Sequence, residues 1–144
     1  MATIYGAGSI TAWAAATITG SFTTNSTYSG FARRVGDTLE CSGRVTFSGA
    51  PNSTSFTIDI PDSLTVDETK TFQSGIVGSL FLSDTGVSTR GVGLLTYNTT
   101  SNVIDAKILV TAPTTLGDVT QAVPITLGST DLITFQFSVP ITGW

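Results

Sequence analysis

Hydrophobic and polar residues alternate along most of this chain, and a period of two is typical of β-strands that bury one face. The two most regular runs span residues 38–48 and 132–139, and Pro140 ends the second. In each run the apolar side chains share one face: Leu39, Cys41, Val45 and Phe47 in the first, and Ile133, Phe135, Phe137 and Val139 in the second. These segments are the clearest predicted strands.

Shorter runs of the same kind are separated by Gly, Pro, Asn and Asp residues. We expect strands at residues 16–22, 28–34, 56–60, 75–83, 90–97, 103–111 and 120–127. Pro124 marks the last of these as an edge or bulged strand, and no segment has a strong helical pattern. About eight short strands with such turns predict an all-β fold, an antiparallel jelly roll or β-sandwich.

The domain organisation follows from a change in composition near residue 30. Residues 1–30 contain no charged residue and are rich in Gly, Thr and Ser. They are interpreted either as an extended N-terminal arm that lies on a neighbouring subunit or as a first strand of the core. Residues 31–144 are predicted to form one β jelly-roll domain, since 144 residues is the size of a single domain.

Composition narrows the possible environments and partners. Only 11% of the residues are charged, against about 25% in ordinary soluble domains, which argues against a lone solvated monomer. A net charge of −4 with six Lys and Arg residues disfavours nucleic acid. We expect no membrane insertion, because Gly, Ser, Thr and Asn interrupt the uncharged N-terminal stretch. We also expect no signal peptide, and a single cysteine fits synthesis in a reducing host cytoplasm.

The residue types needed for catalysis are scarce. The chain has no histidine and one cysteine, so it lacks the usual general base, the usual zinc ligands and any Ser-His-Asp or Cys-His pair. The acidic group Asp59, Asp62, Asp67 and Glu68 does not have the spacing of an EF-hand. Cys41 is predicted to be a buried, unreactive thiol. We therefore expect no enzyme activity, no metal and no cofactor, and we disfavour a small carbohydrate-processing enzyme.

Six residues are candidates for a subunit or capsid interface. The two tryptophans lie in the uncharged N-terminal segment and at the last position, and Trp is enriched among interface anchors. Two adjacent arginines are predicted to straddle one strand, one on each face. Two aromatic residues of the N-terminal segment complete the set, which is Trp13, Phe22, Tyr28, Arg33, Arg34 and Trp144.

Two segments resemble a β domain found in structural proteins of tailed bacteriophages. Residues 31–43 (FARRVGDTLECSG) resemble its opening, and residues 133–144 (ITFQFSVPITGW) resemble its close. Residues 64–67 and 77–84 stand where that domain has two further motifs. The resemblance implies a virion structural protein with a trimer-forming jelly roll, on the capsid surface or on a tail-fibre shaft, and it implies no catalytic residue.

Together these observations predict a capsid decoration protein. It would bind the head surface as a homotrimer, with the major capsid protein or other virion proteins as partners, and stabilise the shell. The alternative is a tail-fibre or receptor-binding tail module. That alternative is disfavoured because the predicted loops at residues 49–54, 84–90 and 98–102 contain no aromatic residue for stacking on a sugar.

Overall fold

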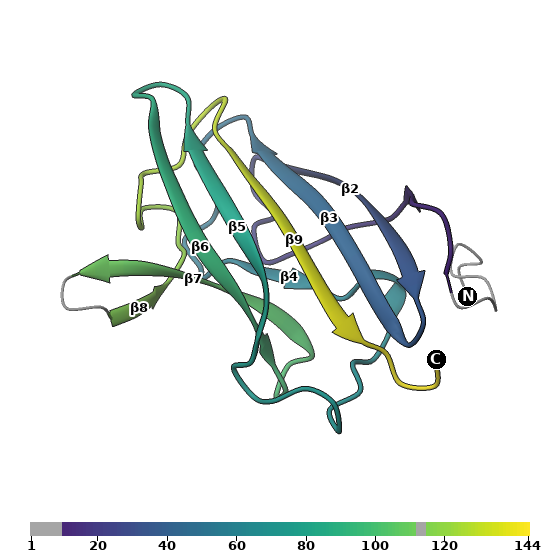
Figure 1. Ribbon diagram of the computed structural model, residues 1–144. Coiled ribbons are helices and arrows are strands. Elements are labelled where there is room, and N and C mark those ends of the chain that lie inside the picture. The colour runs from purple at the N-terminus through teal and green to yellow at the C-terminus, as the bar shows by residue number, and fades with distance from the viewer. Residues whose placement is uncertain (1–9, 112–114) are drawn as a thin grey trace.

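The computed structural model describes residues 10–111 and 115–144 and is built almost entirely of antiparallel strands, which confirms the predicted all-β class. Figure 1 labels most of the elements. Within the described residues a single-turn 3-10 helix, Pro61–Ser63, accompanies nine strands: β1 (Ala14–Ala15), β2 (Ser26–Val35), β3 (Thr38–Phe47), β4 (Thr57–Asp59), β5 (Ile76–Asp84), β6 (Thr89–Asn98), β7 (Val103–Thr111), β8 (Thr115–Asp118) and β9 (Leu132–Pro140).

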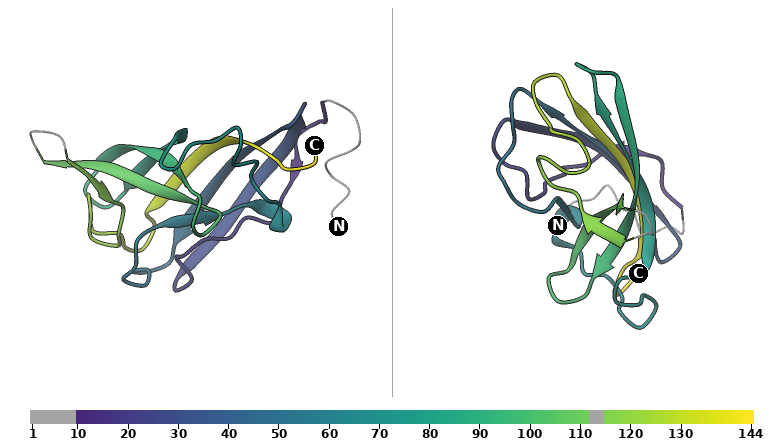
Figure 2. Two further views of the ribbon diagram at one scale, coloured as in Figure 1. Left: turned by 90° about the horizontal axis from the view of Figure 1, so that it is seen from below. Right: turned by 90° about the vertical axis from the view of Figure 1, so that its left-hand side faces the viewer.

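The strands pair in the order β1-β2-β3-β9-β5-β6-β7-β4, and β8 pairs with β7 outside this path. The segment that precedes β2 forms backbone hydrogen bonds both with β2, near one end of this strand order, and with β4, at the other end. Ala16 N donates a hydrogen bond to Gly30 O of β2 (3.0 Å), and Ser21 N donates to Thr57 O of β4 (3.0 Å). The sheet therefore curls into two facing layers, as the views in Figure 2 show.

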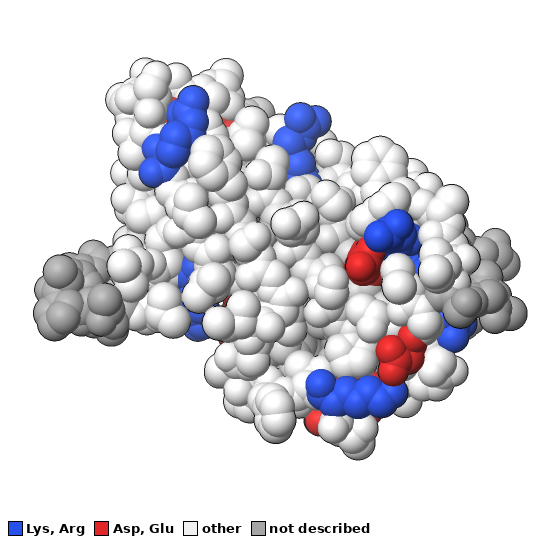
Figure 3. Space-filling view, in the orientation of Figure 1, with Lys and Arg blue, Asp and Glu red and all other residues white. Residues whose placement is uncertain are grey.

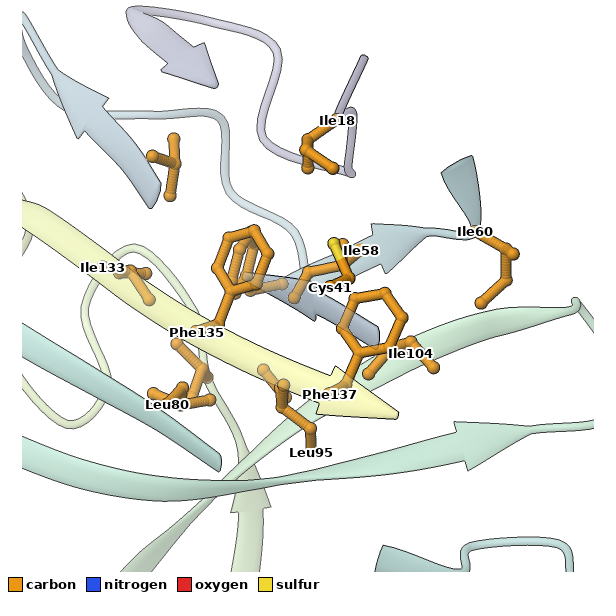
Figure 4. Close-up of a cluster of buried hydrophobic side chains, with 14 of the residues drawn as sticks. Ile18, Cys41, Ile58, Ile60, Leu80, Leu95, Ile104, Ile133, Phe135 and Phe137 are labelled. Atoms are coloured by element: carbon orange, nitrogen blue, oxygen red, sulfur yellow. The ribbon is translucent and has the colours of Figure 1, made fainter. Parts of the chain in front are cut away.

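The core lies between these layers. The apolar faces predicted for residues 38–48 and 132–139 are confirmed, because each of their hydrophobic side chains is at most 4% exposed. Figure 4 shows Phe135 and Phe137 of β9 directed toward Ile58, which comes from the opposite layer. Phe56 stacks on Phe22 with ring centroids 4.9 Å apart and meets Phe135 edge-on at 6.4 Å.

The N-terminal segment belongs to this core. Ile18 is 5% exposed and Phe22 is 0% exposed, so residues 16–22 pack inside their own domain. They form an extended segment with one bridge, Gly20 to Ile58, rather than the continuous strand expected there. The expected domain boundary at residue 30 falls inside β2. Residues 1–9 lie outside the described residues.

The strand predicted at residues 120–127 is wrong. Thr120 and Val123 exchange backbone hydrogen bonds (3.0 and 3.4 Å) and close a tight turn, so their N–H and C=O groups cannot pair with a neighbouring strand. Leu127 is nevertheless buried at 1% exposure, which explains why the segment has the apolar content of a strand. In the described part of the chain, no helix has the length and hydrophobicity to cross a bilayer.

Candidate contact surfaces

The outer face of strands β2, β3, β9, β5 and β6 presents one row of side chains that follows the strand register. Phe31 of β2 pairs with Ser42, Ser42 with Gln136, Gln136 with Ser79, and Ser79 with Leu94 of β6. Alternate residues of a strand point to opposite faces, so this row lies on the side away from the core. Short polar side chains form its middle and apolar side chains form its ends.

A second row lies beside the first. Arg44 of β3 pairs with Thr134, Thr134 with Phe81 of β5, and Phe81 with Val92 of β6. Phe31 is 55% exposed, Phe81 39% and Val92 71%. These side chains are apolar and face solvent on the outside of a folded domain, so packing within the domain does not account for them.

The two rows line a groove, here called the outer groove. The groove has two adjoining parts. The first has a volume of about 670 Å³ and is lined by Phe31, Arg44, Phe81, Val92 and the polar residues between them. An adjoining part of about 730 Å³ shares Phe31, Ser42, Ser79 and Gln136 and extends to Trp13. Figure 3 shows this face with charged atoms around its margin and an uncharged centre over β9 and β5. Volumes of this size are typical of small-ligand sites.

Of the residues that the structure describes, Arg44 is the only charged one that lines the first part of the outer groove. It is exposed, and within the described residues it has no ion pair and no side-chain hydrogen bond. The adjoining part contains one charged residue, Glu40. Its carboxylate accepts a hydrogen bond from Arg33 Nε at 2.6 Å, so its charge is already balanced. The groove as a whole therefore offers one unpaired positive charge.

The adjacent arginines of β2 lie on opposite faces, as predicted, and each holds one tryptophan. The guanidinium carbon of Arg33 lies 4.8 Å from the ring centroid of Trp13. That of Arg34 lies 4.7 Å from the ring centroid of Trp144, and Arg34 Nε also donates to Gly36 O at 2.7 Å. Such cation–π contacts fix both tryptophans against the domain. Trp13 remains 45% exposed and borders the outer groove.

The remaining two predicted contact residues face inward. Phe22 is completely buried, so it has no side-chain surface to offer a partner. Tyr28 is half-buried and packs against the core, and burial raises the pKa of its hydroxyl. Both are aromatic residues of an uncharged segment, and that property does not distinguish a core position from a surface position.

A hairpin of β7 and β8 extends away from the body of the domain (Figure 1). Leu109 and Leu116 are directly paired across it and are 58% and 51% exposed. Neither these leucines nor Phe31 and Phe81 are among the contact residues predicted from the sequence. A leucine on a hairpin and a phenylalanine on a strand both look like core residues until the register of the sheet is known.

The titratable groups of the described residues do not converge on one point. No group of three or more His, Cys, Asp or Glu side chains in this part of the chain could hold a metal ion. Asp59 accepts a hydrogen bond from Thr19 (2.7 Å), and Glu68 accepts one from Tyr97 (3.2 Å). Asp67 lies 3.4 Å from Lys70 Nζ. Hydrogen bonds from the Thr69 hydroxyl, then from the Thr69 backbone N–H and from Lys70, hold the pKa of Asp67 below its ordinary value.

Comparison of the chain with protein-family models, with curated proteins and with solved structures gives no match. The surfaces described above are therefore interpreted from their own chemistry.

Proposed function

We propose that this protein is a structural component of a tailed-phage particle, a decoration protein that binds the capsid surface as a homotrimer and stabilises the shell. The resemblance of residues 31–43 and 133–144 to a phage structural domain supports this proposal. The low charge content of 11% supports it as well. A small domain that stays in solution alone usually carries more surface charge, so few charges favour a domain whose surface is partly covered by partners.

The observation that carries the proposal is the exposed Leu109–Leu116 pair. Two leucines directly opposite each other on a hairpin contribute little to their own core while they are more than half exposed. Burying the remaining exposed half of each side chain against a partner would contribute roughly 1 kcal/mol per leucine. We assign this pair to the contact with a virion neighbour, either another subunit of the trimer or the major capsid protein.

A trimer makes such a small contact sufficient. Each subunit offers the same leucine pair, and the second and third contacts form at a high effective concentration once the first is made. Modest contacts repeated around a symmetry axis therefore give firm attachment. The shell gains stability because every bound trimer ties neighbouring capsid subunits to one another.

The test is the number of copies of this protein in purified particles, measured by quantitative mass spectrometry against the major capsid protein. Decoration requires a ratio of the same order as that of the capsid protein. A handful of copies per particle would instead support the alternative, a tail-fibre or receptor-binding tail module. Absence from purified particles would overturn both proposals.

A variant tests the role of the hairpin. The double change Leu109→Ser and Leu116→Ser should reduce the number of copies per particle at least tenfold. The control is Val87→Ser, which also removes an exposed apolar side chain, 70% exposed, but from the turn between β5 and β6. Equal occupancy by both variants would exclude the leucine pair as the attachment point. Sedimentation of the purified protein tests the trimer independently.

A further inference from the structure

We infer that the outer groove binds an oligosaccharide that carries carboxylate groups, through stacking on Phe31 and Phe81 and an ion pair with Arg44. This inference goes beyond the proposed virion role and does not depend on it, because the groove is separate from the Leu109–Leu116 pair. It concerns a ligand-binding site on the face of the sheet.

The apolar parts of the groove suit the flat C–H faces of sugar rings. Phe31 stands at β2 and Phe81 at β5, and two strands, β3 and β9, lie between them. Three strand spacings of about 4.8 Å, combined with the two-residue offset from Ser79 to Phe81 along β5, place the two aromatic residues roughly 16 Å apart. That separation spans a short oligosaccharide. Aromatic side chains supply large contact areas at low entropic cost.

The floor between the two aromatic residues matches the hydroxyl groups of a sugar. Ser42, Ser79, Thr134 and Gln136 occupy neighbouring register positions, and each can both donate and accept hydrogen bonds. A protein partner fits this floor less well, because serine is depleted in protein–protein interfaces. Polar groups buried there without matched partners would weaken binding.

The positive charge of Arg44 favours a negatively charged ligand. Arg44 lines the groove and has no carboxylate partner among the described residues, and its guanidinium can form two parallel hydrogen bonds with a carboxylate. A second copy of this chain is a poor occupant of the same groove. Among the described residues, the only carboxylate that lines the groove is that of Glu40, which is engaged with Arg33. A copy packed face to face would therefore bury Arg44 without compensation.

The test is a titration of the full 15N-labelled chain, followed by NMR, with two probes: a galacturonic acid pentamer and a sialic acid tetramer. The expected result is saturable binding of at least one probe, with the largest shifts at Ser42, Ser79, Thr134 and Gln136. The methyl ester of the same galacturonic acid pentamer keeps the shape of the ligand and removes its charge, and it should bind at least tenfold more weakly than the acid.

Variants assign the contacts. Arg44→Gln should weaken binding of the acidic probe about tenfold and leave binding of its methyl ester unchanged. Phe31→Ala and Phe81→Ala should weaken both. The matched control is Arg90→Gln, since Arg90 lies outside the groove and donates hydrogen bonds to backbone carbonyls of Asp84 and Thr89. This control should bind as the unchanged protein does.

The inference is overturned if neither probe binds at millimolar concentration, or if Arg44→Gln and Arg90→Gln bind the acidic probe equally well. It is also overturned if groove signals shift with protein concentration alone and Phe31→Ala abolishes that dependence, because the occupant is then a second copy. None of these results bears on the copy number in particles, so the two proposals fail independently.

Discussion

Gly43 of β3 and Phe135 of β9 are direct partners across two neighbouring strands, and the ring of Phe135 folds over the glycine. Phe135 Cζ lies 2.5 Å from the position that a Cβ atom on Gly43 would occupy. The missing side chain makes the space in which the ring meets Phe56 edge-on, with centroids 6.4 Å apart. A glycine on the apolar face of a regular strand is thus explained by one ring of the core.

Gly43→Ala should lower the free energy of unfolding by about 1–3 kcal/mol, the usual cost of forcing an extra carbon into a packed core. Urea denaturation measures the change. The control is Gly86→Ala in the exposed turn between β5 and β6, where the nearest atom to a new Cβ is a carboxylate oxygen at 3.4 Å. That change should stay within about 0.5 kcal/mol. Equal stabilities of the two variants would mean that the ring has room to move.

The buried side chain of Asp131 connects the turn that follows β5 with the loop that precedes β9. It is 3% exposed, and its carboxylate accepts hydrogen bonds from the backbone N–H of Thr85 (2.9 Å) and of Gly128 (2.7 Å). Asp131→Ala leaves both partly buried hydrogen bonds without their acceptor and should cost about 1–3 kcal/mol in total. Thermal or urea unfolding measures the loss.

Asp84 provides the comparison for Asp131. It accepts hydrogen bonds from Gly86 N and Val87 N in the same turn, but it is partly exposed and water can replace it. Asp84→Ala should therefore cost clearly less than Asp131→Ala. If the costs are the same, burial of the carboxylate is not what makes Asp131 important.

Much of the core could be predicted from sequence, because alternate residues of a strand face opposite sides and the apolar ones identify the buried side. The alternation in residues 38–48 and 132–139 identified the inward side chains of β3 and β9, Cys41 included. The same pattern could not identify the outer groove. Phe31 and Phe81 are as apolar as any core residue. Their outward positions follow from pairing with Ser42 across the β2–β3 hairpin and with Thr134 of the distant strand β9. The predicted loops contain no aromatic residue for stacking on a sugar, but these two aromatic residues lie on strands.

The closure of the fold was also hidden from sequence. Residues 16–21 form backbone hydrogen bonds with β2 on one side and with β4 on the other. Almost any residue type can form such bonds, so the sequence does not indicate them. The turn at Thr120–Val123 shows the converse case. Its apolar neighbours Leu127 and Val119 are buried, although residues 120–127 form no strand. The apolar composition predicts a strand there, whereas the backbone hydrogen bonds between Thr120 and Val123 form a turn.

Burial of Cys41 predicts a loss of stability in alkali. Desolvation raises the pKa of its thiol from 9.0 to about 12, so the folded state keeps a proton that the unfolded state releases. Its contribution to stability is therefore complete below pH 9 and is lost as the pH rises from 9 toward 12. The slope approaches about 1.4 kcal/mol per pH unit.

The measurement is the free energy of unfolding at pH 8.5 and at pH 10, for the unchanged protein and for Cys41→Ala. The unchanged protein should lose roughly 1 kcal/mol more over this interval than the variant does. Burial also raises the pKa values of Tyr28 and Tyr97, but both tyrosines are present in the two proteins, so their contribution cancels in the comparison. Equal losses would show that Cys41 does not titrate between the two states.

The chain before β2 should be as necessary to the fold as a core strand. Phe22 is fully buried and stacks on Phe56, so Phe22→Ala should cost about 3–5 kcal/mol. Thr17→Ala, an exposed position in the same segment, should change stability by less than about 0.5 kcal/mol. Urea unfolding followed by circular dichroism measures both. If Phe22→Ala were as stable as Thr17→Ala, residues 16–22 would be a dispensable arm, free to lie on a neighbouring subunit, and their hydrogen bonds to β2 and β4 would not hold the two layers together.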